Sequence, residues 1–450
     1  MMTPNSILAQ TRRGLQLVAG AGVLLVAASC SSILDVKNPN NIAEDALANP
    51  AAAGPEANGA LAALTRALGF STLVYADATD EMDWIGSRDS WNELDKGAIG
   101  NFANEFADDQ FKYTAEARYV ADQAIVRLEG FDKAGTLASR ADLMRSYIYG
   151  AIIYSSIADQ YDDFAFSNKT VAAAPVGRAN MGRLYDTAVG YLDKALAIAT
   201  SNSDKYTILA LRARAKHGKG AWAKVTPKGT AAPSNPLVND AGAVADATAA
   251  IALAAPDATV DLINNVEATA GTNIWYEVNG RNESAPGKVY VVDPTGTTNK
   301  YVAAIKDPIS GTADPRMQAR LTAFKAFGTT AGTLWITSTR ELRLILAEAA
   351  LASGNTAEFT TQINTVRALD GKPAFAGQIA NQDMLVYERQ IQLWLMRRRL
   401  IDMARFGIKD PKWTSNASYD NLFSSTGLLF PIANVERQAN PCIADATKCK

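Results

Sequence analysis

The sequence predicts a mostly α-helical protein in which paired helices form a scaffold and a loop-rich insert carries short strands. Apolar residues recur at helical spacing in alanine-rich segments along most of the chain. Residues 255–335 lose that spacing and gain clusters of Asn, Gly, Pro and Thr. The 450 residues are enough chain for a sizeable core, so ordinary burial can hold such a fold.

Residues 1–29 have the features of a signal peptide. Arg12 and Arg13 precede an uncharged run over 15–28, which is too short to span a bilayer as a helix, because spanning takes about 20 residues. Ala-Ala-Ser precedes Cys30, as in a bacterial lipobox, so we expect Cys30 to be lipidated. Two alternatives remain: a plain secretory signal with an incidental Cys30, and twin-arginine export through Arg12 and Arg13.

We expect residues 30–56 to form a lipidated tether, because polar residues, Asn and Pro dominate the segment. A diacylated cysteine carries two or more acyl chains, which give stable membrane attachment where one chain would not. Ser31 and Ser32 follow Cys30, without the aspartate that favours retention in the inner membrane. The sequence therefore predicts a lipid-anchored protein of the outer membrane, exposed at the cell surface.

A helical region similar to tetratricopeptide (TPR) repeats is expected over 57–254. Its apolar stripes at i, i+3, i+4 and i+7 are typical of helix faces packed in a core. Residues 183–223 hold two such helices joined by a short polar turn, the unit of a TPR repeat, and two further pairs fit within 57–160. The expected helices span 57–68, 105–128, 139–159, 183–200, 205–222 and 241–254.

Residues 255–335 are expected to form loops and short strands. The β-prone run 288–292 is the main strand candidate, and turn signals at Asn279-Gly280 and Pro286-Gly287 precede it. Helices resume in a second TPR-like region, 336–410, with candidates over 339–353, 357–369 and 383–406. Gly354 suits the C-cap of the first of these helices. Residues 411–450 form a C-terminal tail.

Charge and histidine content exclude several function classes. Lys plus Arg (44) and Asp plus Glu (46) give a formal charge of −2, whereas nucleic-acid binders carry a basic surface. His217 is the single histidine, which removes most histidine-based metal sites and catalytic triads. We expect no cofactor, no metal and no nucleic-acid partner.

Two cysteines remain if Cys30 carries lipid. Cys442 and Cys449 lie close together in the tail, and an exported chain meets an oxidising space, so a short disulfide is expected. The alternative is a metal site, for which no histidine or third cysteine lies nearby.

Two charged clusters admit a functional and a structural interpretation. The run Arg397-Arg398-Arg399 could bind an anion, but we favour an ion pair of Arg399 with Asp402 or Glu388, with the other two arginines solvated. An acidic cluster could bind calcium or hydrolyse glycosides, but it lacks EF-hand spacing, and we favour a solvated loop. The cluster comprises Asp77, Asp80, Glu81, Asp83 and Asp89.

Aromatic residues in the non-periodic segments are the ligand-binding candidates. Trp84 and Trp91 lie in one polar stretch, and Trp275 and Tyr276 in another. An indole can bury the apolar C–H face of a sugar ring while neighbouring polar groups hydrogen-bond its hydroxyls. The alternative for each residue is that the ring fixes its loop to the helical core.

Several landmarks together resemble the SusD/RagB family of nutrient-binding outer-membrane lipoproteins. After the lipobox, Ile33-Leu34-Asp35-Val36 is similar to the family's FLDV entry, and Asn58-Gly59 to the start of its first helix. The order and spacing of these fragments cover nearly the whole chain. The remaining similar fragments are Asp314-Pro315-Arg316, the segment 388–407 from Glu388-Arg389 to Gly407, and the tail from Phe430-Pro431-Ile432 through Glu436 to Asn440-Pro441.

The sequence also departs from the family pattern. Gln392 and Met396 stand where the family tends to have Glu, and Arg397 stands where it has Gly. Asp122 falls where an Asn is frequent. These departures indicate a divergent branch and leave the ligand class open.

The resemblance implies a non-catalytic protein that captures an oligomeric nutrient, a glycan above all, and delivers it to a SusC-like TonB-dependent transporter. Two alternatives from other classes remain: a TPR-type scaffold lipoprotein that binds proteins only, and an exported glycosidase. The insert favours the first hypothesis over the scaffold, because a pure scaffold needs no loop domain.

Overall fold

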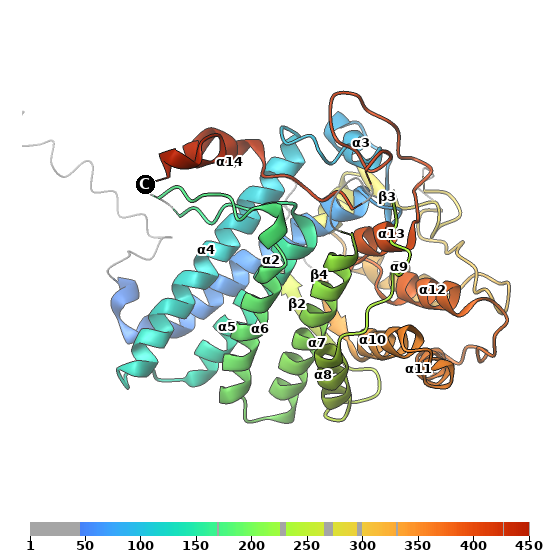
Figure 1. The fold of residues 1–450 in the computed structure, drawn as a ribbon, viewed down its shortest axis with the longest axis horizontal. Helices are drawn as coiled ribbons and strands as arrows, with labels where there is room; N and C mark the ends of the chain where they lie inside the picture. Colours follow the sequence, from blue (N-terminus) through green and yellow to red (C-terminus); the bar gives the residue numbers. More distant parts are fainter. Residues whose placement is uncertain are drawn as a thin grey trace, which may run out of the picture. The chain divides into compact units, whose positions relative to one another are not determined.

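The computed structural model describes residues 46–168, 171–225, 231–264, 273–294, 299–329, 332–425 and 427–449 (Figure 1). The chain divides into two units, 1–52 and 53–450. Of the first unit the structure describes two short 3-10 helices, Ala46–Ala48 and Pro50–Ala52. The predicted signal peptide 1–29, the lipidation site Cys30 and the motif 33–36 lie outside the described residues.

The second unit is mostly helical, as predicted. Successive helices pack against their sequence neighbours: α4 contacts α2 and α5, α5 contacts α6, α6 contacts α7, and α7 contacts α8. Figure 1 shows α4 to α8 as this array of neighbouring helices. The helices of the array are α2 (Ala53–Asp77), α4 (Glu105–Lys133), α5 (Arg140–Gln160), α6 (Arg183–Ile198), α7 (Asn202–Val225) and α8 (Ala241–Ile251).

The remaining helices include the second predicted pair. α10 packs on α11, on α12 and back on α8, which joins this part to the array. Gly354 follows α10 at φ 77°, a left-handed conformation that suits glycine after a helix end. These helices are α3 (Asp89–Asp95), α9 (Pro315–Ala326), α10 (Thr339–Ala352), α11 (Thr356–Ala368), α12 (Asn381–Gln392), α13 (Arg399–Phe406) and α14 (Asn434–Ala439).

One helical stretch, Pro50–Asp77, is long and apolar enough to cross a membrane. Most of its apolar window is buried inside the fold, as expected of a core helix.

Two antiparallel two-stranded ribbons complete the unit. β1 (Met82–Trp84) pairs with β3 (Ser284–Pro286), and β2 (Thr259–Asn264) pairs with β4 (Gly332–Ser338). The predicted strand 288–292 is wrong. The β1–β3 ladder ends at the pair Met82 and Pro286, before residue 288. Within 288–292, the Tyr290 backbone N–H donates to the Gly287 carbonyl and closes a turn.

Helix α9 lies inside the predicted loop insert and was not expected. Its start carries strong local signals: Asp314 caps it by accepting a hydrogen bond from Arg316 N–H, and Pro315 occupies its first position.

The single helix predicted over 383–406 is also wrong, because the chain breaks between α12 and α13. Leu395 and Arg397 have φ values of 59° and 57°, which no helix allows. Arg397 stands where the family pattern has glycine, the residue that adopts this conformation most easily. Tertiary contacts stabilise the break: the Glu81 carboxylate accepts a hydrogen bond from Leu395 N–H (2.7 Å), and the Tyr75 hydroxyl accepts one from Leu400 N–H (3.0 Å).

The arginine run is buried, which corrects the expectation that two of its members are solvated. Arg399 pairs with Asp80, and Arg398 with Asp159, both at 2.6 Å. Arg397 donates to the Thr72 hydroxyl at 2.9 Å. The expected partners of Arg399 are engaged elsewhere: Asp402 binds Arg389 and Arg405, and Glu388 binds Arg316 and Arg367.

The acidic cluster is likewise no solvated loop. Asp77, Asp80, Glu81 and Asp83 are all at least nine-tenths buried, and Asp89 alone of the five is exposed. Lys412 neutralises Asp83 at 2.5 Å and Asp95 at 2.6 Å. The cluster is therefore part of the packed core, where buried carboxylates need cationic partners.

Candidate functional site

A groove of about 240 Å³ lies on the outer face of the β2–β4 ribbon. Its lining residues come from the β2–β4 ribbon, from α9, from the start of α10, from the end of α12 and from the segments beside them. The lining residues are Asp257, Thr259, Asp261, Arg316, Ala319, Arg320, Trp335, Thr337, Ser338, Arg340, Asp370, Gln392 and Met396.

Trp335 and Asp261 form the centre of the floor. They are directly opposite each other in the antiparallel ladder, so their side chains lie on the same face of the ribbon. Leu334 and Ile336, the neighbours of Trp335 in β4, are buried, whereas Trp335 is partly exposed. The two-residue period of a strand thus directs the indole to the groove.

A chain of aromatic contacts holds Trp335 in place from below. Its ring centroid lies 6.1 Å from that of Phe327 and 6.2 Å from that of Trp394. Phe327 in turn contacts Trp275 at 5.9 Å. The indole is therefore held by packing, which a stacking platform requires.

Arginines and carboxylates alternate around this floor. Arg340 binds Asp257 at 2.5 Å and 2.7 Å and Asp370 at 3.0 Å. The hydrogen bond from Arg340 holds the pKa of Asp257 below its ordinary value. Burial raises the pKa of Asp261, whose Oδ2 accepts a hydrogen bond from Thr259.

Arg320 contacts an aromatic ring and a backbone carbonyl, whereas Arg340 forms ion pairs with two carboxylates. The Arg320 guanidinium lies 5.5 Å from the Trp335 ring centroid and donates to the Gln392 carbonyl at 2.7 Å. Burial lowers its pKa to about 10. The carboxylates of Asp370 and Asp257 act on this guanidinium electrostatically.

Two buried polar atoms at the groove have no partner within the described part of the chain. They are the Thr337 hydroxyl oxygen and the Gln392 Nε2 amide nitrogen. Both residues are 1% exposed and both line the groove. Both atoms have less than 1 Å² of accessible surface, so each is an unpaired polar atom of the core beside the groove, at a cost in free energy.

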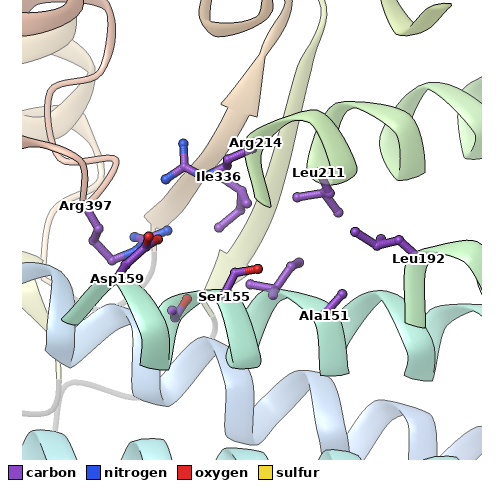
Figure 2. A pocket seen from close by; sticks show the side chains of 10 residues that line it. Ala151, Ser155, Asp159, Leu192, Leu211, Arg214, Ile336 and Arg397 are labelled. Atoms are coloured by element: carbon purple, nitrogen blue, oxygen red, sulfur yellow. The ribbon is translucent and has the colours of Figure 1, made fainter. Parts of the chain in front are cut away.

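A second cavity of about 20 Å³ lies in the core beside Arg397 (Figure 2). Figure 2 shows Asp159 and Arg397 at one end of it and Ala151 and Leu192 at the other. Burial lowers the pKa of Arg397 to about 9. The space suits one water molecule, so the cavity belongs to the core.

Of the four predicted aromatic ligand residues, Trp91 and Trp275 are unsuited to stacking, which corrects the prediction for them. Trp91 is fully buried and stacks on Phe106 at 3.7 Å. Trp275 is 2% exposed and lies under Gly332, where a Cβ would come within 2.3 Å of its ring. Trp91 lies in α3, which packs on α2 and α4, so its ring faces the core.

Trp84 and Tyr276 are partly exposed and stay candidates. Trp84 ends β1, and its backbone N–H donates to the Asp95 carboxylate at 3.1 Å. Tyr276 begins the π-helical turn Tyr276–Gly280. The structure does not bring them into the groove with Trp335.

Trp335, Thr337 and Gln392 were missed by the sequence reasoning. The alternation in the segment 332–338 is a signal for a strand with Trp335 on its exposed face, but the predicted boundary between the insert and the second helical region, at 335/336, divides this run. Gln392 and Met396, two of the departures from the family pattern, both line the groove.

In the tail, Cys442 and Cys449 form a disulfide with Cα atoms 5.0 Å apart. Among the described residues, no group of three His, Cys, Asp or Glu side chains is arranged to hold a metal ion.

No protein-family model matches the chain, and no curated protein matches its sequence. Solved structures do match it. A SusD superfamily protein from Bacteroides vulgatus is similar with a TM-score of 0.58 at 14% identity, over 88% of this chain and 98% of that one. A SusD superfamily protein from Bacteroides fragilis gives 0.57 at 15% identity, over 88% and 99%.

A third match is a SusD-like carbohydrate binding protein from Bacteroides vulgatus, with a TM-score of 0.53 at 12% identity, over 88% of this chain and 97% of that one. Likeness at such low identity concerns the fold, and it confirms the architecture that the sequence fragments imply. The chain has a SusD-like fold, in a divergent sequence.

Proposed function

We propose that this protein is a divergent SusD/RagB-type lipoprotein that captures an oligomeric nutrient, a glycan in the first instance, and delivers it to a SusC-like TonB-dependent transporter. The observation that carries the proposal is the SusD-like fold, matched over 88% of the chain. A lipid on Cys30 would hold the protein at the outer membrane, on the cell surface.

The surface chemistry of the second unit supports binding of a polyhydroxyl ligand. A partly exposed indole, carboxylates and guanidinium groups meet in one groove, and one of the similar structures is named a carbohydrate binding protein. A capture protein needs such groups held in place and must release its ligand to the transporter. Trp84 and Tyr276 are further candidate contacts from the predicted set.

A protein-binding scaffold is the second candidate function. An open groove of about 450 Å³ lies between α8, α10 and α11, the kind of surface on which helix-pair proteins bind segments of partners. Its walls combine Val244, Ile251 and Leu346 with Arg343 and Glu358. This groove would serve the scaffold alternative or the transporter contact equally.

The test is affinity purification of the tagged full-length protein from native outer membranes. We expect a β-barrel transporter to be recovered in near-stoichiometric amount, and the purified protein to bind a polysaccharide without turning it over. Recovery of other proteins only, with no transporter and no glycan binding, would favour the scaffold. Turnover of the polysaccharide would favour the glycosidase.

A further inference from the structure

We infer that the cavity beside Arg397 binds a single monatomic anion, of the charge and size of chloride, as the counter-ion of the buried Arg397 guanidinium. The inference is independent of the proposed function and of the groove on the β2–β4 ribbon. Its basis is the set of contacts that Arg397 makes, the charge of the groups around it, and the size and lining of the cavity.

Arg397 is a buried cation whose hydrogen bonds within the described chain go to uncharged oxygens. Its side chain is 3% exposed. Nη1 donates to the Thr72 hydroxyl at 2.9 Å, and Nη2 donates to the backbone carbonyl of Trp335 at 3.5 Å. Burial lowers the pKa of Arg397 to about 9, so the guanidinium keeps its charge at neutral pH. A charge held in the core without a counter-charge is strongly destabilising.

The two nearby carboxylates are already paired with other arginines. Asp159 binds Arg398 at 2.6 Å. Glu341 accepts two hydrogen bonds from Arg214 Nη1, at 2.6 Å and 2.5 Å. Three arginines therefore meet two carboxylates in this cluster, and one positive charge is left over. Arg214 and Arg398 both act on Arg397 by repulsion.

Glu81 also acts on Arg397, but it does not supply the counter-charge at neutral pH. Its Oε1 accepts a hydrogen bond from Leu395 N–H at 2.7 Å, and its Oε2 is buried without a partner among the described residues. Burial raises the pKa of Glu81 to about 8, so the carboxyl carries a proton most of the time at pH 7. The excess positive charge beside the cavity therefore stays uncompensated by Glu81.

The cavity has the size of a small ion. Its volume of about 20 Å³ holds one particle of about the size of a water molecule, which admits chloride or bromide and excludes sulfate and phosphate. Ala151, Ser155 and Asp159 line it from one face of α5, because they are four residues apart. Figure 2 shows Ser155 between the end with Asp159 and Arg397 and the end with Ala151.

The lining offers donors and positive charge to an anion. The hydroxyls of Ser155 and Ser156 line the cavity and form no hydrogen bond within the described part of the chain, so both can donate to a bound ion. Two guanidinium groups, those of Arg397 and Arg214, face one carboxylate, that of Asp159, which Arg398 neutralises.

Apolar side chains complete the lining. In such surroundings the attraction between an anion and a guanidinium is much stronger than in water, which favours a halide over a neutral water molecule beside Arg397. The apolar residues are Ala151, Ile152, Leu192, Leu211 and Ile336.

The first measurement is diffraction from crystals of the full-length mature protein grown with sodium bromide as the only halide salt. Bromide has the charge of chloride and nearly its size, and it scatters X-rays anomalously near its absorption edge. We expect an anomalous peak in the cavity, within hydrogen-bond distance of the Arg397 guanidinium.

The second measurement is the melting temperature of the same protein at neutral pH, as sodium chloride replaces sodium gluconate at constant ionic strength. Gluconate is too large for the cavity. An ion that binds only the folded state raises the melting temperature with its concentration, so we expect a rise of about 2 °C or more between about 1 and 300 mM chloride.

Three variants locate the effect. Arg397→Met removes the guanidinium, and Ser155→Val fills the cavity while leaving every charge in place, so both should lose the chloride dependence. Arg343→Met is the matched control. Arg343 is a partly buried arginine outside the cavity, and its Nη1 likewise donates to an uncharged oxygen, that of Gln362 at 3.2 Å. This variant should keep the chloride dependence of the wild type.

The combined outcomes decide the inference. A bromide peak beside Arg397, with a chloride dependence that Arg397→Met and Ser155→Val lose, supports it. A water molecule in place of the peak overturns it, and so does an unchanged chloride dependence in Arg397→Met. A peak without chloride dependence in solution means binding at crystal concentration only and also overturns it. If Arg397→Met does not fold, Ser155→Val decides the comparison.

Discussion

Arg399 and Asp80 form a two-point ion pair in the core, Nε to Oδ1 at 2.7 Å and Nη2 to Oδ2 at 2.6 Å, although they are 319 residues apart in the sequence. Both side chains are nearly fully buried. The pair joins the segment after the first long helix of the second unit to the break between α12 and α13.

Breaking this pair should strongly destabilise the protein. Asp80→Asn leaves the Arg399 guanidinium buried without its counter-charge, which typically costs about 3–5 kcal/mol. The measurement is urea unfolding followed by circular dichroism. Asp89→Asn, in the exposed member of the same acidic cluster, is the control and should cost no more than about 1 kcal/mol. Equal losses in the two variants would contradict the assignment.

Glu81 should make stability depend on pH. Burial raises its pKa from 4.5 to about 8, so the folded protein keeps a proton that the unfolded chain loses. Stability from this group is therefore fully present below pH 4.5 and is lost as pH rises towards 8, by up to about 5 kcal/mol. Glu81→Gln should remove this loss, because the amide oxygen can still accept the hydrogen bond from Leu395.

The measurement is the unfolding free energy of Glu81→Gln minus that of the wild type, across pH 4.5 to 8. The difference should grow in favour of the variant as pH rises. Glu116→Gln, the same substitution at a half-exposed side chain, is the surface control. A difference for Glu81→Gln that stays constant with pH would show that the carboxyl ionises normally in the fold.

Trp91 should contribute to stability and Trp84 much less. Trp91→Ala removes a fully buried ring stacked on Phe106 and should cost about 3–5 kcal/mol. Trp84→Ala truncates a partly exposed ring and should cost less than half as much. Thermal unfolding of the two variants decides this, and a larger loss for Trp84→Ala would reverse the assignment of core and surface.

Cys30 should be the lipidated first residue of the mature protein. Cys30→Ala should therefore move the protein from the membrane fraction to the soluble fraction, since the acyl chains provide the anchor. Fractionation in high salt, in a strain without the transporter, is the measurement. Full retention of the variant in the membrane would refute lipid anchoring at this residue.

Cys442 and Cys449 should be bonded in the exported protein. Thiol labelling of unreduced, denatured protein should find neither cysteine free. The bond closes a short loop, with a sequence separation of 7, so replacing both cysteines by Ala should cost towards the low end of the roughly 0–5 kcal/mol that disulfides contribute. Labelling of both thiols in native protein would exclude the bond.

The helical architecture follows from local patterns in the sequence. Apolar residues at helical spacing form a pattern over three or four residues, so it can be recognised without any tertiary contact. The segments that form α4, α5, α6, α7 and α10 carry this pattern. Gly354 after α10 is a local signal of the same kind. The fragments shared with the SusD/RagB pattern likewise indicated the fold that the solved structures confirm.

The roles of the charged and aromatic residues depend on contacts between distant segments. The sequence predicts a nearby partner for Arg399 and solvent around Arg397 and Arg398. The prediction fails because the partners of Arg399 and Arg398 are Asp80 and Asp159, which are hundreds of residues away. The helix over 383–406 broke at Leu395 because Glu81, from a distant segment, binds its backbone N–H. A pattern that repeats over three or four residues does not identify contacts between segments far apart in the sequence.

The groove depended on tertiary structure for the same reason. Trp335 and Asp261 meet through the pairing of two strands 74 residues apart, and Gln392 reaches them from a third segment. Trp91 and Trp335 both lie outside the predicted helices. Trp91 is fully buried and Trp335 is partly exposed, because distant elements cover the two rings to different extents.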